Sequence, residues 1–243
     1  MADLTGRVAL VTGGSRGIGA AIAISLADAG ASVAVNYREQ ELQAQSVADA
    51  LRGLGVDAMT VRADVSKAAE VAGMVAAIER ELGPVDILVN NAGVGLIRNV
   101  EDLTEADFDT TIAVNLKSVF LCTQAVLPGM RARKWGRIVN ISSGAARGAG
   151  GIGPHYNASK AGMEGLTRGY AARLVKDGIT VNAVAPSLIE TDMVRQGLAS
   201  SPSRIPLGRF GTPQECAQVV MMLVATEYMT GQTVALSGGM SFL

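Results

Sequence analysis

The chain has 243 residues, of which 49% are hydrophobic and 18% charged, and its formal net charge is −1. This composition supports a large buried core and excludes a mainly disordered chain, while the balanced charge gives no sign of a nucleic-acid or membrane-surface binder. A chain of this length fits one large α/β domain better than two small ones, so we expect residues 1–243 to form a single domain.

Short apolar runs rich in valine, isoleucine and alanine alternate with longer helical patterns along the whole chain. Strands are predicted over 7–13, 32–37, 58–65, 85–93, 136–143, 179–186 and 232–239. Helices are predicted over 18–30, 39–54, 67–82, 104–130, 156–176 and 213–225. Near-continuous apolar strands separated by helices indicate a seven-stranded parallel sheet covered on both faces, which is a doubly wound α/β fold.

The first predicted strand leads into the glycine-rich turn TGGSRGIG, residues 12–19, which opens the first helix. Glycines allow a tight turn and let backbone N–H groups approach a ligand, and a helix N-terminus favours an anion such as a pyrophosphate. Gly13, Gly17 and Gly19 are spaced G-x-x-x-G-x-G, and no Gly-Lys-Ser/Thr follows, which excludes a phosphate-loop NTPase. The turn predicts dinucleotide binding, with a ligand-free strand–helix turn as the alternative.

The second predicted strand ends in the sequence VNYRE, which bears on the choice of cofactor. A fold selective for NAD usually places Asp or Glu near this point to hold the ribose 2′-hydroxyl, but Asn36 and Tyr37 are uncharged and Arg38 follows. Arg16 lies in the glycine turn. Two arginines with no carboxylate before Glu39 suit the 2′-phosphate of NADP(H), because a guanidinium grips phosphate through paired hydrogen bonds. We therefore predict NADP(H), with two solvated surface arginines as the alternative.

Tyr156 and Lys160 stand four residues apart in the predicted helix, so they share one of its faces. An ammonium about 4 Å from the phenolic oxygen would, at an effective dielectric of about 20, attract the phenolate by about 4 kcal/mol. That attraction corresponds to a tyrosine pKa lower by about three. Tyr156 would then act as a general acid or base near neutral pH, whereas a surface pair without a catalytic role is the alternative.

Targeting and metal-binding signals are missing from the sequence. No apolar run reaches the roughly 18 residues of a membrane span, and the N-terminal MADLTGRVALVTGG lacks the basic and long apolar regions of a secretion signal. Cys122 and Cys216 have no metal-ligand spacing, and His155 is the one histidine. We expect a cytoplasmic protein with two buried free thiols, no metal, and neither nucleic acid nor membrane as a partner.

The motifs, in this order, resemble those of the classical short-chain dehydrogenases/reductases over essentially the whole chain. The matching stretches are TGGSRGIG (12–19), ADV (63–65), NNAG (90–93), VNLKS with Asn115, NISS with Ser143, the Y-x-x-x-K pair of Tyr156 and Lys160, and VAPSLIETDM (184–193). The resemblance implies a Rossmann-type fold and an NADP(H)-dependent oxidoreductase that interconverts a carbonyl and a secondary alcohol.

The resemblance also implies the roles of individual residues. Ser143 would hold the substrate carbonyl, Tyr156 would give the proton, and Lys160 would lower the tyrosine pKa and bind the nicotinamide ribose. Asn115 would help to hold a water that connects Lys160 to solvent. The cofactor-binding residues would be Gly13, Ser15, Arg16, Gly17, Ile18, Gly19, Asn36, Tyr37, Arg38, Asp64, Val65, Asn91, Ala92, Gly93, Tyr156, Lys160, Pro186, Ile189 and Thr191. His155 is read as a bystander at the helix start, or as a residue that lines the pocket.

Within the family, the stretches GRFGTPQE (208–215), TGQTV (230–234) and SGGM (237–240) are most similar to those of 3-oxoacyl-(acyl-carrier-protein) reductases and acetoacetyl-CoA-reducing relatives. This similarity predicts reduction of 3-oxoacyl thioesters, as in fatty acid biosynthesis. Ser187 departs from the glycine usual there, and Asp177 lies where carrier-protein reductases often have a basic residue. Docking of an acyl carrier protein is therefore in doubt, although Lys134, Arg137 and Lys176 can supply positive charge.

Other functions stay open. One is a dehydrogenase or reductase of another small secondary alcohol or ketone, such as a polyol, a sugar or a hydroxy compound. A non-catalytic NADP-binding regulator is a remote alternative, because it predicts loss of Tyr156, Lys160 or Ser143, and all three are present. Arg147, which follows Ser143 among small residues, would either meet an anionic substrate or be an ordinary exposed loop arginine.

The polar segment 187–205, which contains Gly197 and Pro202, follows the last cofactor motif. It is predicted to be a mobile substrate lid, with a static surface loop as the alternative. Small residues along the predicted helix 156–176 permit close helix packing, within the domain or across a two-fold interface. The family resemblance implies a homotetramer with 222 symmetry.

Overall fold

The structure, a computed structural model, describes residues 3–192, 194–195 and 201–241. Within these residues seven parallel strands form one sheet in the order β3-β2-β1-β4-β5-β6-β7. The strands are β1 (Val8–Val11), β2 (Ser32–Tyr37), β3 (Ala58–Arg62), β4 (Ile87–Asn90), β5 (Gly136–Ile141), β6 (Ile179–Pro186) and β7 (Thr233–Leu236). The order runs outward in both directions from the β1–β4 pair, which confirms the predicted doubly wound α/β fold.

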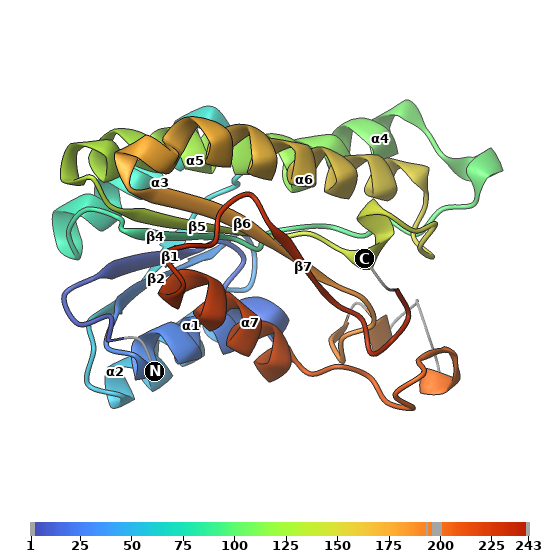
Figure 1. Ribbon diagram of the computed structural model, residues 1–243, viewed down its shortest axis with the longest axis horizontal. Coiled ribbons are helices and arrows are strands. Elements are labelled where there is room, and N and C mark those ends of the chain that lie inside the picture. Colours follow the sequence, from blue (N-terminus) through green and yellow to red (C-terminus); the bar gives the residue numbers. More distant parts are fainter. Residues whose placement is uncertain (1–2, 193, 196–200, 242–243) are drawn as a thin grey trace.

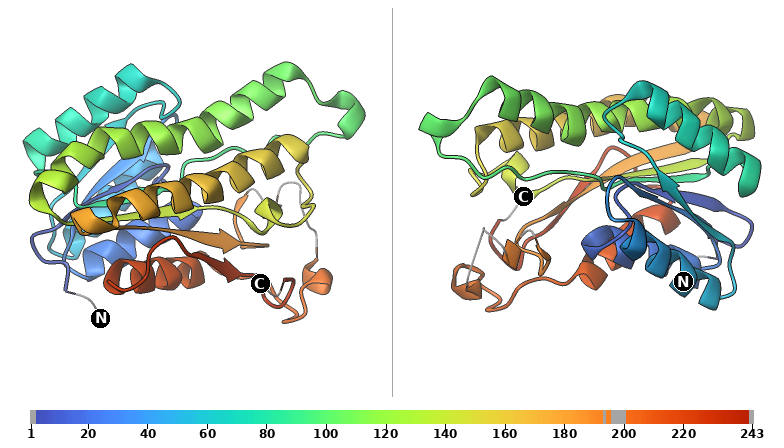
Figure 2. Two further views of the ribbon diagram at one scale, coloured as in Figure 1. Left: turned by 45° about the horizontal axis from the view of Figure 1, so that its top comes forward. Right: turned by 180° about the vertical axis from the view of Figure 1, so that it is seen from behind.

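Helices cover both faces of this sheet, as Figure 1 shows from one side and Figure 2 from two others. One layer consists of α1 (Gly17–Asp28), α2 (Glu41–Gly53) and α7 (Pro213–Ala225). The other consists of α3 (Ala68–Glu81), α4 (Glu105–Ile112), α5 (Ser118–Arg133) and α6 (Pro154–Leu174). A π-helical turn at Ala113–Lys117 joins α4 to α5, so both read as one long helix in the sequence.

Among the described residues, most of the core lies in two hydrophobic clusters, one on each face of the sheet. Successive residues of a strand point to opposite faces, so Leu10 and Val11 of β1 belong to different clusters. In the parallel register, Leu10 lies between Ala34 of β2 and Leu88 of β4. Burial of both strand faces explains why the strands read as continuous apolar runs rather than as alternating ones.

The continuous helical run Glu105–Arg133 is long and apolar enough, by length and composition, to cross a membrane, since an 18-residue window within it has a mean hydropathy of 1.3. Its apolar residues have a simpler explanation in the fold. Val119, Cys122, Val126 and Met130 recur at helical spacing and are all buried, the last three in the hydrophobic cluster on this face of the sheet. The run is thus accounted for as a core helix.

Both cysteines are buried and free, as expected from the sequence. Cys122 lies on α5 and Cys216 on α7, in the two opposite helical layers. Burial raises the pKa of each thiol to about 12, so both are protonated at neutral pH. They behave as small apolar core residues.

The ends of several elements differ from the prediction. The strand predicted over 85–93 ends at Asn90, and the one predicted over 136–143 ends at Ile141, because the residues that follow leave the sheet to line a cleft. Helix α6 begins two residues earlier than expected, at Pro154, since proline is well suited to the first helical position. Helix α4 begins after Thr104, which forms a capping box with Asp107.

Candidate active site

A cleft of about 1540 Å³ lies at the carboxyl end of the sheet, where β1 and β4 diverge. In doubly wound folds ligands bind at this switch point. Every residue expected to bind the cofactor lines the cleft, and so do Ser143, Tyr156 and Lys160. Asn115 does not line it but lies fully buried behind its wall. The structure therefore brings the separate sequence motifs together in one site.

The glycine-rich turn is shaped to leave room beside the backbone. Gly13 and Gly17 have φ values of +61° and +54°, which favour glycine. A Cβ on Gly19 would lie 2.4 Å from the Gly13 carbonyl oxygen and 2.5 Å from Nδ2 of Asn91. Arg16, the residue before α1, makes no side-chain cap, so the first N–H groups of the helix are not taken up by such a cap. This turn fits the pyrophosphate of a dinucleotide.

The side chains of Thr12 and Asn91 hold the turn in place. The sequence predicts cofactor binding for Asn91 and gives Thr12 no role of its own. Oγ1 of Thr12 accepts hydrogen bonds from the backbone N–H groups of Asn91 (3.0 Å) and Ala92 (3.1 Å). Nδ2 of Asn91 donates in return to the carbonyls of Thr12 and Gly13, both at 2.9 Å. These bonds join the end of β1 to the end of β4 and fix the floor of the cleft. The Asn-Asn pair at the end of β4 was the sequence signal for this role.

Asn36 has a structural task as well. Its Oδ1 accepts from the Gly13 N–H at 3.2 Å, and its Nδ2 donates to the carbonyls of Val61 (3.3 Å) and Ala63 (3.1 Å). The side chain is buried, and its amide is fully engaged with backbone. Asn36 thus ties the glycine turn to β2 and β3, which leaves its side chain little capacity for a cofactor.

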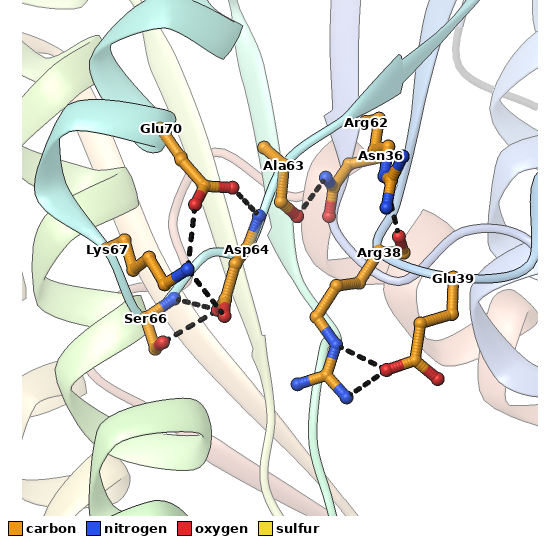
Figure 3. A network of polar contacts seen from close by, with 9 residues as sticks. All are labelled: Asn36, Arg38, Glu39, Arg62, Ala63, Asp64, Ser66, Lys67 and Glu70. Atoms are coloured by element: carbon orange, nitrogen blue, oxygen red, sulfur yellow. Dashed lines mark hydrogen bonds and ion pairs between the residues drawn. The ribbon is translucent and has the colours of Figure 1, made fainter.

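The two arginines expected at the 2′-phosphate are both paired with carboxylates. Nε of Arg38 donates to Oε1 of Glu39 at 3.0 Å, and its Nη2 contacts the same oxygen (Figure 3). Nη1 of Arg16 lies 3.1 Å from Oδ2 of Asp192. The sequence predicts both arginines at a 2′-phosphate but does not show these two pairings, and Glu39 lies in the cleft lining together with Arg38.

Asp64 lies at the same end of the cleft, in the network of Figure 3. Its Oδ1 accepts from the Ser66 N–H at 3.0 Å and from the Ser66 hydroxyl at 2.7 Å. Burial acts to raise the pKa of Asp64, but the hydrogen bonds from Ser66 outweigh it and hold the pKa below its ordinary value. Asp64 is therefore a fixed carboxylate that shapes the turn after β3.

Ser143 and Tyr156 meet at the other end of the cleft. Ser143 follows β5 in extended conformation, with φ −162°, and Tyr156 lies in the first turn of α6. Burial raises the pKa of the Tyr156 phenol, while a side-chain hydrogen bond with Ser143 acts in the opposite direction. Tyr156 is thus a protonated phenol, beside a hydroxyl that can share a bound carbonyl oxygen with it.

Lys160 lies behind this pair and is 4% exposed. Its Nζ donates to the Ile141 carbonyl at 2.7 Å and lies 5.7 Å from the centre of the Tyr156 ring. Burial lowers the pKa of Lys160 to about 8. The expected lowering of the Tyr156 pKa by Lys160 is wrong for this arrangement. The ammonium faces the end of β5, and burial has the largest effect on the tyrosine pKa, which it raises.

Asn115 occupies the π-helical turn between α4 and α5, and such turns are frequent at functional sites. Its Oδ1 accepts from the Val94 N–H at 2.8 Å, and its Nδ2 donates to the Val94 carbonyl at 3.0 Å and to Oγ of Ser159 at 3.2 Å. A Cβ on Gly93 would lie 3.3 Å from Oδ1 of Asn115 and 3.7 Å from Nζ of Lys160. Asn115 therefore positions the segment after β4 against the catalytic helix.

Two further polar residues complete the wall near Ser143. Nε of Arg147 donates to Oε2 of Glu164 at 2.9 Å, and the Ser142 hydroxyl donates to Oε1 of Glu164 at 3.3 Å. Glu164 is buried, so Arg147 neutralises a carboxylate of this chain, which makes it neither a free substrate-binding cation nor an unpaired loop arginine.

A Cβ on Gly144 would lie 2.6 Å from Oγ of Ser187, so Ser187, which departs from the family pattern, packs directly on the backbone after Ser143.

The segment after β6 lies over the glycine turn. Ile189 pairs with Gly211 in an isolated bridge, and a Cβ on Gly17 would lie 3.5 Å from Cγ2 of Thr191. Pro186, Ile189 and Thr191 thus line the cleft where the sequence predicted them. Of the predicted lid 187–205, positions 193 and 196–200 lie outside the described residues.

His155 is buried at the start of α6, beside the site, and is not among the residues that line the cleft. Its Nε2 lies 3.0 Å from the Leu96 carbonyl, an acceptor, so Nε2 carries the proton, while the buried Nδ1 has no partner among the described residues. The Arg98 N–H donates to the Ile152 carbonyl at 3.2 Å, and Ile152 packs with Tyr156. His155 therefore fastens the loop after β4 to the start of α6.

His155→Gln and His155→Asn are expected to behave differently. A glutamine amide nitrogen reaches the position of Nε2 and keeps the bond to Leu96, whereas an asparagine nitrogen lies near Nδ1 and leaves that carbonyl unpaired. We expect the asparagine variant to lose about 1–2 kcal/mol of unfolding free energy and to raise the KM for the carbonyl substrate, and the glutamine variant to change little. Urea unfolding and steady-state kinetics measure both, and equal behaviour of the two variants would contradict the assignment.

The surface expected to attract an acyl carrier protein is largely neutralised. Asp177 accepts from Nε of Arg131 at 2.9 Å and from Nζ of Lys134 at 3.0 Å. Arg137 is buried and pairs with Glu227, so it offers no surface charge. Lys134, Arg137 and Lys176 were expected to supply positive charge. Among the described residues, only Lys176 is neither buried nor paired with a carboxylate.

The cleft combines a glycine turn that fits a pyrophosphate with a buried lysine and a serine–tyrosine pair. This combination, at the switch point of a doubly wound sheet, is typical of a nucleotide-dependent oxidoreductase. A family model for short chain dehydrogenases matches residues 7–200. The chain belongs to the short-chain dehydrogenase family.

Three similar proteins show the range of activities in this family. The 3-oxoacyl-(acyl-carrier-protein) reductase of Staphylococcus aureus (strain Mu50) is 41% identical over 241 residues, which cover 96% of this chain and 97% of that protein. A reductase of the same description from Synechocystis is 41% identical over 245 residues and 99% of both chains. A solved gluconate 5-dehydrogenase from Burkholderia cenocepacia J2315, in complex with NADP and tartrate, has a TM-score of 0.90 at 36% identity, covering 98% of this chain and 96% of that one.

Proposed function

We propose that the protein is an NADPH-dependent carbonyl reductase that converts 3-oxoacyl thioesters to 3-hydroxyacyl thioesters. The observation that carries the proposal is the placement of Ser143, Tyr156 and Lys160 on one wall of the nucleotide cleft. The similarity to two 3-oxoacyl-(acyl-carrier-protein) reductases supports the substrate class. The cofactor, when bound, supplies the hydride, and the protein supplies position and electrostatics.

The residues of this chain divide the work as follows. The Ser143 hydroxyl hydrogen-bonds the substrate carbonyl oxygen and holds it beside Tyr156. Tyr156, whose pKa is raised by burial, gives its phenolic proton to that oxygen as negative charge develops on it. Lys160, whose ammonium donates to the Ile141 carbonyl on the wall of the cleft, would bind the ribose of the nicotinamide end. Asn115 holds the segment after β4 against α6 through its hydrogen bonds to Val94 and Ser159.

NADP(H) is proposed as the cofactor because the cleft combines the glycine cradle with Arg16 and Arg38 near the end of β2. The Burkholderia dehydrogenase, solved with NADP, supports this choice. Arg38 reaches a 2′-phosphate only by sharing or leaving its contact with Glu39. Lys160, which lies beside the Tyr156 ring, would contact the nicotinamide ribose, and Thr191, which lies beside Gly17, would contact the cofactor where it leaves the glycine turn.

A second candidate function is the oxidation or reduction of a small hydroxy compound. Two observations favour it: the pairing of Asp177 with Arg131 and Lys134, which weakens a carrier-protein dock, and the similarity to a gluconate 5-dehydrogenase. In either case we propose a cytoplasmic enzyme.

We also propose a homotetramer. The proposal is supported by Phe108 on α4 and Phe120 on α5, which are exposed in one copy of the chain and would be buried by contact with a second copy.

The test is to mix the purified protein with acetoacetyl-CoA and to follow the absorbance of NADPH, and of NADH in parallel. Rapid oxidation of NADPH would support the thioester reductase. Tight NADPH binding without turnover of the thioester, together with turnover of gluconate and NADP, would replace it with the second function. Failure of the protein to bind either nucleotide would contradict both.

A further inference from the structure

Glu39 is the acidic side chain that directly faces the arginine proposed to hold the 2′-phosphate. It lies two residues after the end of β2 and lines the cleft together with Arg38. Its Oε1 accepts from Nε of Arg38 at 3.0 Å and also contacts Nη2, so two of the five N–H donors of the guanidinium are turned toward it (Figure 3). Both side chains are more than half exposed, at 65% and 52%.

The other charged groups around this point are occupied elsewhere. Nζ of Lys67 lies 3.0 Å from Glu70, and Asp64 is held by Ser66. Arg62 donates to the backbone carbonyl of Arg38 at 3.2 Å rather than to a carboxylate. Figure 3 shows that Arg38 and Glu39 form a separate pair, apart from the Asp64, Lys67 and Glu70 cluster. Glu39 is therefore the carboxylate in direct contact with Arg38, while the charge of Asp64 acts on Arg38 without a contact.

We propose that Glu39 is a specificity-determining residue that competes with the 2′-phosphate of NADP(H) for Arg38 and accepts a hydrogen bond from the 2′-hydroxyl of NAD(H). This inference rests on the proposed binding of a nicotinamide dinucleotide in the cleft. It predicts a protein that accepts both nucleotides, with the ratio of their affinities set by Glu39.

The competition follows from the charges. A phosphate bound to Arg38 carries nearly two negative charges and either displaces the Glu39 carboxylate or lies next to it, and both arrangements cost free energy. The ribose 2′-hydroxyl of NAD(H) is instead a donor that a carboxylate near the end of the second strand can accept. An exposed arginine–carboxylate pair is weak, so Glu39 tunes the preference and does not block NADP(H).

Glu39→Gln tests the proposal, because the amide keeps the size of the side chain and removes its charge. We expect NADPH to bind about threefold tighter and NADH about threefold weaker, an overall shift of about tenfold in the affinity ratio. The measurement is a fluorescence titration of each nucleotide without any carbonyl substrate. Asp49→Asn is the matched control, since Asp49 also pairs with an exposed arginine, Arg52 at 2.6 Å, but on α2 outside the cleft lining, and it should leave both affinities unchanged.

The outcomes separate this inference from the proposed function. An unchanged affinity ratio in Glu39→Gln, or a shift of equal size in Asp49→Asn, would overturn the role of Glu39 even if the wild type prefers NADPH. A wild type that prefers NADH would contradict the proposed cofactor, yet a shift toward NADPH in Glu39→Gln would still support the role of Glu39. A protein that binds neither nucleotide would overturn both.

Discussion

Tyr156→Phe is expected to lower kcat for carbonyl reduction by about 10²–10⁴-fold while leaving the affinity for the nucleotide nearly unchanged. The phenylalanine ring keeps the packing of Tyr156 against Ala145 and Ile152 and removes only the hydroxyl. Among the described side chains beside Tyr156, Lys160 also carries a proton, but it is turned to the Ile141 carbonyl. The loss should therefore fall on the chemical step, and rapid-quench or steady-state kinetics with NADPH at saturation measure it.

Tyr170→Phe is the matched control for that experiment. Tyr170 lies on the same helix, α6, and its hydroxyl accepts a hydrogen bond from Nε2 of Gln124 at 2.9 Å, outside the cleft lining. Loss of this exposed hydroxyl should leave kcat as it is. A Tyr156→Phe protein with at least a third of the wild-type turnover would show that the proton comes from another donor, and the assignment of Tyr156 would be abandoned.

The fold was largely predictable from the sequence because both faces of each strand are buried. Apolar runs such as those containing Leu10 and Leu88 have no reading other than central strands, and their alternation with helices leaves few topologies. The end of each strand was less predictable. Asn90 is followed by Asn91, Ala92 and Gly93, and Ile141 by Ser142 and Ser143, and these residue types do not mark the point at which the backbone leaves the sheet to line the cleft.

The members of the candidate site were also predictable, but not their partners. The spacing of Tyr156 and Lys160 placed them on one helix face, and the structure confirms that both border the cleft. The sequence did not show that Lys160 points to the Ile141 carbonyl, since that depends on how α6 packs on β5. Nor did it show that Arg16 meets Asp192, 176 positions away in the chain, because such an ion pair carries no local pattern.

The sequence reading gave Asn36 and Asn115 direct roles, whereas the structure shows both amides bound to backbone. Each of these side chains satisfies N–H and C=O groups of segments that follow strands, Asn36 at Gly13 and Asn115 at Val94. Buried backbone groups need such partners, and an asparagine supplies a donor and an acceptor together. A motif residue can thus serve the site by holding its loops, and only the folded arrangement distinguishes this from contact with a ligand.

Lys160→Met is expected to abolish measurable turnover and at the same time to stabilise the fold at pH 7. The pKa of Lys160 in the folded protein is about 8 against an ordinary value of 10.5, because burial disfavours the ammonium. This difference corresponds to roughly 3 kcal/mol of unfavourable free energy when the folded state carries the charge. Methionine removes that cost but leaves the Ile141 carbonyl without its donor, which costs about 1–3 kcal/mol, so a net gain of up to about 2 kcal/mol is expected.

The stability difference between Lys160→Met and the wild type is expected to depend on pH. Between about pH 8 and 10.5 the unfolded chain holds a proton on Lys160 that the folded chain has lost, so the lysine's contribution to the free energy of unfolding rises with pH in this window. The advantage of Lys160→Met over the wild type should therefore be largest at pH 7 and shrink toward pH 10. Urea unfolding at both pH values and one protein concentration measures it, with Lys176→Met, an exposed lysine just beyond α6, as the control that should change neither value. A methionine variant less stable than the wild type at pH 7 would mean that the Ile141 bond outweighs the cost of burying the charge.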